Sequence, residues 1–287
     1  MFSISKTGSG FYCIECSATE DGPKVIKSKF IKSIQNINDT NVLKNILKSF
    51  KPTLKQESKS LSVTLEENNF LFSEVKIDSK IGSEQFISWY EKNILNEDFV
   101  KFYDLYYFPL CNKNFLVISL EKEYKNKLLS NCKDLGYDLI NLSIGIFSTA
   151  VLVKQLYKKN DFILWKIDKN NYHYFLHISD GKIKTFSKMK KSNKNIKKIF
   201  LIGDNNKEFQ NILTSILIQK KEFQGKNKIY IYRINNSLRW INEIEKAGMK
   251  KNNFIDISTL FELTTHKSFK NRIKYVENGI AFRGLDV

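Results

Sequence analysis

The segment of residues 162–184 constrains the fold more than any other part of the chain. Phe162–Ile167 is mostly apolar, Tyr172–Ile178 is aromatic and β-branched, and polar residues separate the two stretches. A second polar turn contains Asp180 and Gly181, and glycine adopts a positive φ without steric cost. Apolar stretches of this length between tight turns predict a three-stranded antiparallel meander.

The N-terminal part of the chain shows the same order of elements. We expect strands at Phe2–Lys6, Phe11–Ser17 and Lys24–Ile31, followed by a helix that Pro52 ends. Three meandering strands, a helix, a strand and a helix therefore occur twice, first from Phe2 and again from Phe162. We predict a first half at residues 1–136, with a subdomain inserted at about 58–110, and a second half at residues 137–287.

The remainder of the second half carries three further predictions. Lys188–Lys198 is expected to be a solvated basic loop, and Ile199–Ile202 a buried strand. Helices are expected at Glu208–Lys220 and from about Asn271 to Arg283.

The composition limits the class of protein. A chain of 287 residues with 42% hydrophobic residues can fill two cores, and four cysteines do not make a disulfide framework. We find no apolar run long enough for a membrane span and no signal peptide, so a cytoplasmic location is expected. The formal charge of +17 favours anionic partners, unless scattered lysines only reflect an A/T-rich genome.

Three groups of motifs resemble one family. The first comprises Trp89-Tyr-Glu-Lys-Asn, Phe102-Tyr-Asp-Leu-Tyr-Tyr, Phe115-Leu-Val-Ile-Ser and Leu128–Gly136. The others are Ile199-Phe-Leu-Ile-Gly-Asp204 and Asn278-Gly-Ile-Ala-Phe-Arg-Gly-Leu285. Together they are similar to PilM, the actin-like protein of type IV pilus assembly, and to its MshI-type and GspL relatives.

The resemblance implies a duplicated ribonuclease-H-like (actin-like ATPase) α/β fold with a small inserted subdomain. It also implies a cytoplasmic adaptor, peripheral to the inner membrane, that binds the tail of a PilN-like membrane protein and couples it to an assembly ATPase. In that mode the tail lies in a groove beside the inserted subdomain. The candidate partner-binding residues are Phe102, Tyr103, Tyr106 and Tyr107.

The resemblance also locates a nucleotide site, which we interpret as degenerate. Ser5 and Thr7 replace the Asp and Gly of the first phosphate turn, although Gly8, Ser9 and Gly10 still provide a flexible turn. Lys166 replaces the Asp of the second turn, where Asp168 follows, and only Gly203 remains of the adenosine glycines, with Asp204 beside it. A protonated lysine cannot bind Mg²⁺, so we expect no catalytic residues, no metal and no cofactor, with ATP and Mg²⁺ as the alternative.

Two other functions stay open at this point. A working ATPase or kinase of the same fold would need carboxylates in the cleft, and a nucleic-acid-binding ribonuclease-H-like protein would need several for its metals. Cys13 and Cys16 lie on one predicted strand without a second pair, so we interpret them as small apolar residues. His173 and His177 are interpreted as structural or solvent-exposed.

Overall fold

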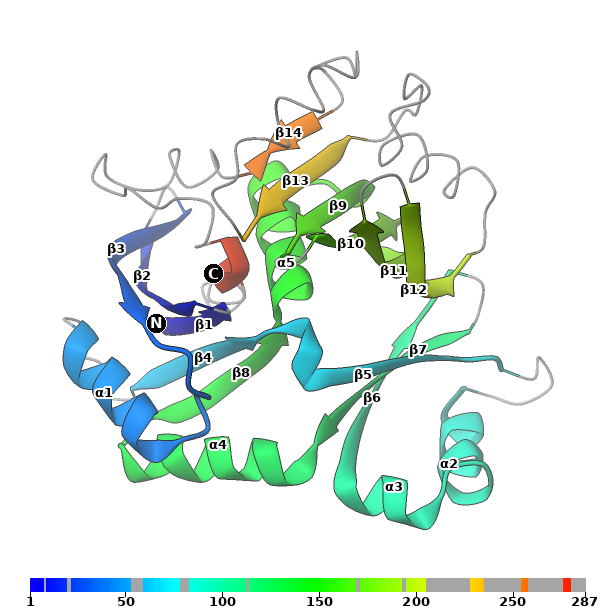
Figure 1. Ribbon diagram of the computed structural model, residues 1–287, viewed down its shortest axis with the longest axis horizontal. Helices are drawn as coiled ribbons and strands as arrows, with labels where there is room; N and C mark the ends of the chain where they lie inside the picture. Colours follow the sequence, from blue (N-terminus) through cyan, green and yellow to red (C-terminus); the bar gives the residue numbers. More distant parts are fainter. Residues whose placement is uncertain are drawn as a thin grey trace.

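The computed structural model shows a chain built on three β-sheets (Figure 1). It describes residues 1–7, 9–19, 22–52, 59–77, 83–111, 114–168, 171–192, 195–204, 228–234, 254–257 and 276–279. The helices predicted at Glu208–Lys220 and from Asn271 to Arg283 fall largely or wholly outside these residues.

The first sheet contains five strands, in the order β3-β2-β1-β4-β8. The strands are β1 (Phe2–Thr7), β2 (Gly10–Thr19), β3 (Gly22–Lys32), β4 (Ser60–Leu65) and β8 (Asp138–Ile144). The first three form the predicted antiparallel meander, β4 is parallel to β1, and β8 is parallel to β4.

The second sheet repeats this arrangement. Its order is β12-β11-β10-β9-β13-β14, with β9 to β12 antiparallel in succession and β13 and β14 parallel to β9. The strands are β9 (Phe162–Ile167), β10 (Tyr172–Ser179), β11 (Lys182–Ser192), β12 (Asn195–Gly203), β13 (Ile229–Arg233) and β14 (Phe254–Asp256). Apart from the added edge strand β12, the two sheets have the same order and directions. The predicted duplicated actin-like α/β fold is confirmed.

The third sheet belongs to the inserted subdomain, in the order β5-β7-β6. It comprises β5 (Phe70–Val75), β6 (Tyr103–Pro109) and β7 (Phe115–Glu121). The short 3₁₀ helix η1 (Glu67–Asn69) precedes β5, and α2 (Ser83–Asn93) and α3 (Glu97–Phe102) lie between β5 and β6. A small core of Val75, Phe86, Phe115 and Val117 holds α2 against the sheet.

Three further α-helices are α1 (Thr40–Phe50), α4 (Lys122–Asp134) and α5 (Gly145–Tyr157). Asp39 caps α1 by accepting the N–H of Asn41 at 2.9 Å, and Gly136 follows α4 with a φ of 74°. The helix α5 connects the two halves and runs between their sheets (Figure 1). Within the described residues, no helix is long and apolar enough to cross a membrane.

Two predicted boundaries need correction. The first sheet extends past residue 136, because β8 pairs with β4 and supplies its fifth strand. The strand β4 belongs to this sheet too, so the insertion begins after Leu65 and continues through β7 to Glu121.

The lysine-rich stretch was also predicted wrongly. Lys188–Lys198 is mainly strand and not a loop, because β11 and β12 pair along it up to Ser192 and Asn195. Ile199 is exposed and only Ile202 of the following residues is fully buried, since β12 lies at the edge of the sheet.

Candidate functional site

The first predicted phosphate turn lies at the tip of the β1–β2 hairpin. Ser5 and Thr7 are fully buried on β1, and neither hydroxyl has a hydrogen-bond partner among the described residues. Ser9 accepts the N–H of Ser33, and a Cβ on Gly10 would lie 2.4 Å from the carbonyl oxygen of Ile31. Gly8 lies outside the described residues. The tip of this hairpin is therefore closely packed against β3.

Lys166, from the second predicted turn, is at the centre of a buried ion cluster. Its Nζ lies 2.6 Å from Oε2 of Glu67 and 2.5 Å from Oε1 of Glu277. All three side chains are about 1% exposed. Because Glu67 belongs to η1 and Lys166 to β9, the cluster joins the first half of the chain to the second. We call these three residues the ion cluster.

The cluster contains one ammonium and two carboxylates. Burial opposes the charge on Lys166, but Glu277 and Glu67 outweigh it and hold the pKa of this lysine well above its usual value. Burial raises the pKa of Glu277 to about 7, against the attraction of Lys166. Two carboxylates thus share a single buried ammonium, which favours the protonated form of Glu277 more than an ordinary ion pair would.

Several neighbouring groups hold the ion cluster in place. Oε1 of Glu67 accepts the N–H of Ile146 at 2.9 Å, at the start of α5 where the helix dipole favours an anion. The hydroxyl of Tyr232 donates to Oε1 of Glu277 at 3.1 Å. Gly145 passes so closely that a Cβ there would lie 2.5 Å from Glu277 Oε1. The cluster therefore fixes both β13 and the first turn of α5.

The ion cluster lies beside the first strand of the chain. Asn278, next to Glu277, donates to the backbone carbonyl of Tyr12 at 3.0 Å, and Tyr12 is the cross-strand partner of Ser5. The structure thus brings Ser5 and Lys166 to the same region. Asp168 follows Lys166, and its N–H donates to the carbonyl of Tyr172 at 2.8 Å.

Gly203 and Asp204 lie elsewhere. Gly203 on β12 is the cross-strand partner of Thr185 on β11. Across the sheet from Thr185 come His177 on β10 and then Ile163, at the beginning of β9. Lys166 is near the other end of β9, so the sheet separates these positions. The strand that pairs in parallel with β9 is β13, and not β12, the strand that ends at Gly203. The motif that resembles the family's adenosine-binding glycines therefore lies on an edge strand, β12.

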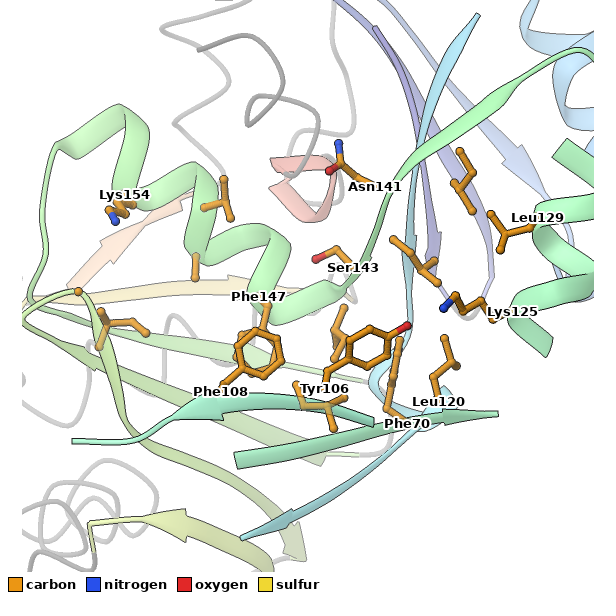
Figure 2. A pocket seen from close by; sticks show the side chains of 18 of the residues that line it. Phe70, Tyr106, Phe108, Leu120, Lys125, Leu129, Asn141, Ser143, Phe147 and Lys154 are labelled. Carbon is orange, nitrogen blue, oxygen red and sulfur yellow. The ribbon is translucent and has the colours of Figure 1, made fainter. Parts of the chain in front are cut away.

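A second candidate site is a groove of about 510 Å³ beside the inserted subdomain (Figure 2). Its floor is largely apolar. The lining residues come from β6 and β7 (Tyr106, Phe108, Ile118, Leu120), from α5 (Phe147, Ala150, Val151, Lys154) and from most of β8. The rings of Phe108 and Phe147 stack across it, with centroids 6.3 Å apart. Residues from both halves and the insertion thus form one cavity.

Polar side chains of the groove are few, and the charged ones among the described residues are the lysines Lys125 and Lys154. Lys125 and Lys154 line different ends of it, and no acidic side chain of the described residues lines it (Figure 2). Lys125 pairs with Asp104 at 2.7 Å. The strand β8 is the last in its sheet, so among the described residues one edge of its backbone has no strand partner. Such an edge offers hydrogen bonds to an extended peptide.

The structure separates the four predicted partner-binding residues. Tyr106 lines the groove. Tyr107 packs in the opposite direction, against Phe115 in the small core of the insertion. Tyr103 stacks on Phe99, and Phe102 is 55% exposed at the end of α3. Sequence alone missed Phe147 as a lining residue because its proximity to Phe108 depends on how the insertion docks on α5.

Other tempting residues are structural. Cys13 and Cys16 are buried and free, and His173 and His177 are also buried, so they are not solvent-exposed. Within the part of the chain that the structure describes, no group of three His, Cys, Asp or Glu residues is arranged to hold a metal.

No family model and no curated protein matches this sequence. Among solved structures, the PilM–PilN type IV pilus biogenesis complex is similar over 100% of this chain and 98% of that chain, with a TM-score of 0.62 and 11% identity. The cytoplasmic domain of EpsL, from the type II secretion system of Vibrio cholerae, covers 81% of each chain at a TM-score of 0.46 and 11% identity. A Bacteroides thetaiotaomicron protein with an actin-like ATPase fold covers 92% of this chain and 95% of its own, at a TM-score of 0.46 and 12% identity. The first similarity shows that the whole chain has the fold of PilM.

Proposed function

We propose that this protein is an adaptor of a type IV pilus or type II secretion assembly. It binds the cytoplasmic tail of a PilN-like membrane protein in the groove between β6, β8 and α5. The observation that carries the proposal is the groove itself, which combines apolar walls, an open strand edge and two lysines. Those features suit an extended peptide better than a small polar substrate.

The chemistry of the groove specifies the tail. Its backbone pairs with β8, while alternate apolar side chains pack against the stacked rings of Phe108 and Phe147. An acidic residue of the tail pairs with Lys154, because no acidic side chain of the groove competes for that lysine. The tail is therefore expected to be apolar with at least one carboxylate.

We further propose that the cleft between the halves does not hydrolyse ATP. The ion cluster supports this proposal, since Lys166 is already neutralised by Glu67 and Glu277 of the same chain. A Mg²⁺ ion needs free carboxylate and phosphate oxygens, and a buried ammonium at this position would repel it.

The location of the adaptor follows from its partner. A chain that binds a membrane-protein tail works beside the inner membrane, on the side where the assembly ATPase also acts. The formal charge of +17 supports this arrangement, because lysines near an anionic leaflet are attracted to it.

A thermal unfolding experiment tests these proposals. The protein is heated alone, with millimolar Mg-ATP, or with a synthetic peptide of the cytoplasmic tail of the PilN-like protein from the same organism. A peptide at 100 times its Kd should add roughly 2.7 kcal/mol to the free energy of unfolding. Stabilisation by Mg-ATP alone would instead indicate a nucleotide-binding enzyme, and salt-dependent binding to DNA or RNA would indicate a nucleic-acid-binding protein.

A matched pair of variants locates the peptide. Ala150→Trp places a large side chain in the groove from α5 and should abolish stabilisation by the peptide. Asn45→Trp adds the same side chain to an exposed position of α1, outside the groove, and should leave stabilisation unchanged. Equal binding by both variants would place the peptide elsewhere.

A further inference from the structure

The segment from Glu67 to Glu74 connects the ion cluster to the groove. Glu67 belongs to the ion cluster. The amide oxygen of Asn68 accepts a hydrogen bond from the ammonium of Lys188 on β11 at 3.0 Å. Phe70 lines the groove. Oε2 of Glu74 accepts the N–H of Gly203 at 2.9 Å. One short segment of the first half therefore contacts the second half at both of its ends.

Aromatic packing strengthens the same connection. Phe72 on β5 lies between two residues of the second sheet, with centroid distances of 5.0 Å to Phe186 and 5.6 Å to Phe200. Phe186 also contacts Phe147 of the groove, at 5.3 Å. A shift of the second sheet would therefore move β5 and the wall of the groove together.

The ion cluster holds the opposite wall of the groove as well. Glu67 accepts the N–H of Ile146, while Ile144 and Phe147 on either side line the groove. Figure 2 shows Phe70 and Phe147 facing the same cavity. The cluster thus fixes two of the elements that shape the groove, β5 and the start of α5. A buried ion is costly without its partner. An arrangement in which only some contacts of the ion cluster are formed is therefore unfavourable, so we expect the contacts to form and break together.

We propose that the ion cluster is a latch that couples closure of the two halves to the shape of the groove. The inference rests on the proposed function, because it assigns the regulation of the peptide-binding groove. With the latch closed, the groove has the shape that binds the tail; with the latch open, β5 and α5 separate and affinity falls. The coupling is reciprocal, so a bound tail also stabilises the closed halves.

The test measures the distance between the two halves and the affinity of the groove as two separate quantities. Lys166→Met alone would leave two buried carboxylates and disturb folding, so the main variant is E67Q/K166M/E277Q, which removes every charge of the cluster and keeps side-chain volume. The control K44M/E84Q/E97Q makes the same changes at exposed positions. Spin labels on K48C in α1 and K197C in β12 report the distance between the halves, with the exposed Cys111 replaced by serine in all proteins.

The coupling predicts two results with the tail peptide as probe. The cluster variant should show a broader distribution of distances between the labels and bind the peptide at least tenfold more weakly than the control. In the protein with an intact cluster, the peptide should narrow this distribution. The second result needs no cluster variant, so the inference stays testable if E67Q/K166M/E277Q does not fold.

The outcomes distinguish this inference from the proposed function. If the wild-type protein does not bind the peptide, the proposed function fails and the coupling fails with it. If the wild type binds but the peptide leaves the distance distribution unchanged, only the coupling is overturned. A folded cluster variant that binds as tightly as the control would overturn it too.

Discussion

The ammonium of Lys166 lies 2.6 Å from the carboxylate of Glu67, with both side chains about 1% exposed, and this pair joins the two halves of the chain. A buried pair of this kind is not automatically stabilising, because desolvation offsets the attraction between the charges. Its removal is asymmetric, however. The loss of one partner leaves an uncompensated charge, whereas neutralising every member of the cluster does not.

Lys166→Met should therefore lower the free energy of unfolding by about 3–5 kcal/mol. The triple variant E67Q/K166M/E277Q should lose less than the single variant, although it changes more residues. Urea unfolding followed by fluorescence measures both. Lys44→Met, at an exposed position of α1, should change stability by less than about 0.5 kcal/mol. A single variant no less stable than the triple one would refute this account of the cluster.

Acid should destabilise the protein through two buried histidines. Burial lowers the pKa of His173 to about 3 and that of His177 to about 4, with Lys191 and Lys184 acting in the same direction. Below about pH 6.5 the folded state thus binds fewer protons than the unfolded state. The stability that the two neutral histidines provide is therefore present above that pH and is lost as the pH falls. Each histidine should cost up to about 2 kcal/mol between pH 6.5 and pH 5.

Unfolding free energies measured across this range check the histidine prediction. His173→Gln keeps an acceptor for the indole N–H of Trp165, which donates to Nδ1 of His173 at 3.1 Å, and it should flatten the pH dependence. Glu277 acts in the opposite sense, because its raised pKa makes the free energy of unfolding fall as the pH rises from about 4.5 to 7. The wild type and the variant both contain Glu277, so its contribution cancels when their pH dependences are compared. Equal slopes for the variant and the wild type would contradict the role given to His173.

Two exposed phenylalanines should differ in their effect on tail binding. Phe108 is 40% exposed and lines the groove, whereas Phe102 is 55% exposed and does not. Phe108→Ala should weaken binding of the tail peptide about tenfold or more, because aromatic side chains in a groove often dominate binding. Phe102→Ala should leave affinity unchanged. Isothermal titration distinguishes the two, and the reverse order would place the partner at α3.

Two glycines with positive φ should tolerate alanine differently. At Gly203, φ is 91° and a Cβ would lie 2.3 Å from the carbonyl oxygen of Lys184. At Gly181, φ is 73° and nothing lies within 4 Å of the Cβ position. Gly181→Ala should cost about 1–2 kcal/mol for the left-handed backbone, and Gly203→Ala should cost more because a backbone must also move. Thermal denaturation of both variants tests the order.

Local patterns predicted most of the elements correctly. The Asp180-Gly181 turn has positive φ at both residues, of 50° and 73°, as a two-residue hairpin requires. The N-terminal meander and the helix α1 also lie where the apolar runs and Pro52 indicated. These features depend on residues close together in sequence, so a single sequence contains the necessary information.

Contacts between distant residues were not predictable in this way. Glu67 lies in a polar stretch and Glu277 directly precedes the C-terminal motif, and nothing in the sequence paired either of them with Lys166. The first part of β12, up to Lys198, was predicted as loop because its lysines hid the alternation that pairs it with β11. Gly203 followed an apolar run, but its place in the sheet depends on the order of the strands and not on the run itself.

The position of β12 at the edge of the second sheet has a consequence for how copies of this chain behave in a crowded cell. Ile199–Ile202 is a β-prone apolar run, and among the described residues no strand pairs with the outer side of β12. An edge of that kind tends to recruit strands of other molecules. Lys197 and Lys198 directly precede the run and are exposed. Their charges repel the same edge on another copy, as gatekeeper residues do beside aggregation-prone segments. Some of the lysines thus protect the protein from assembling with itself.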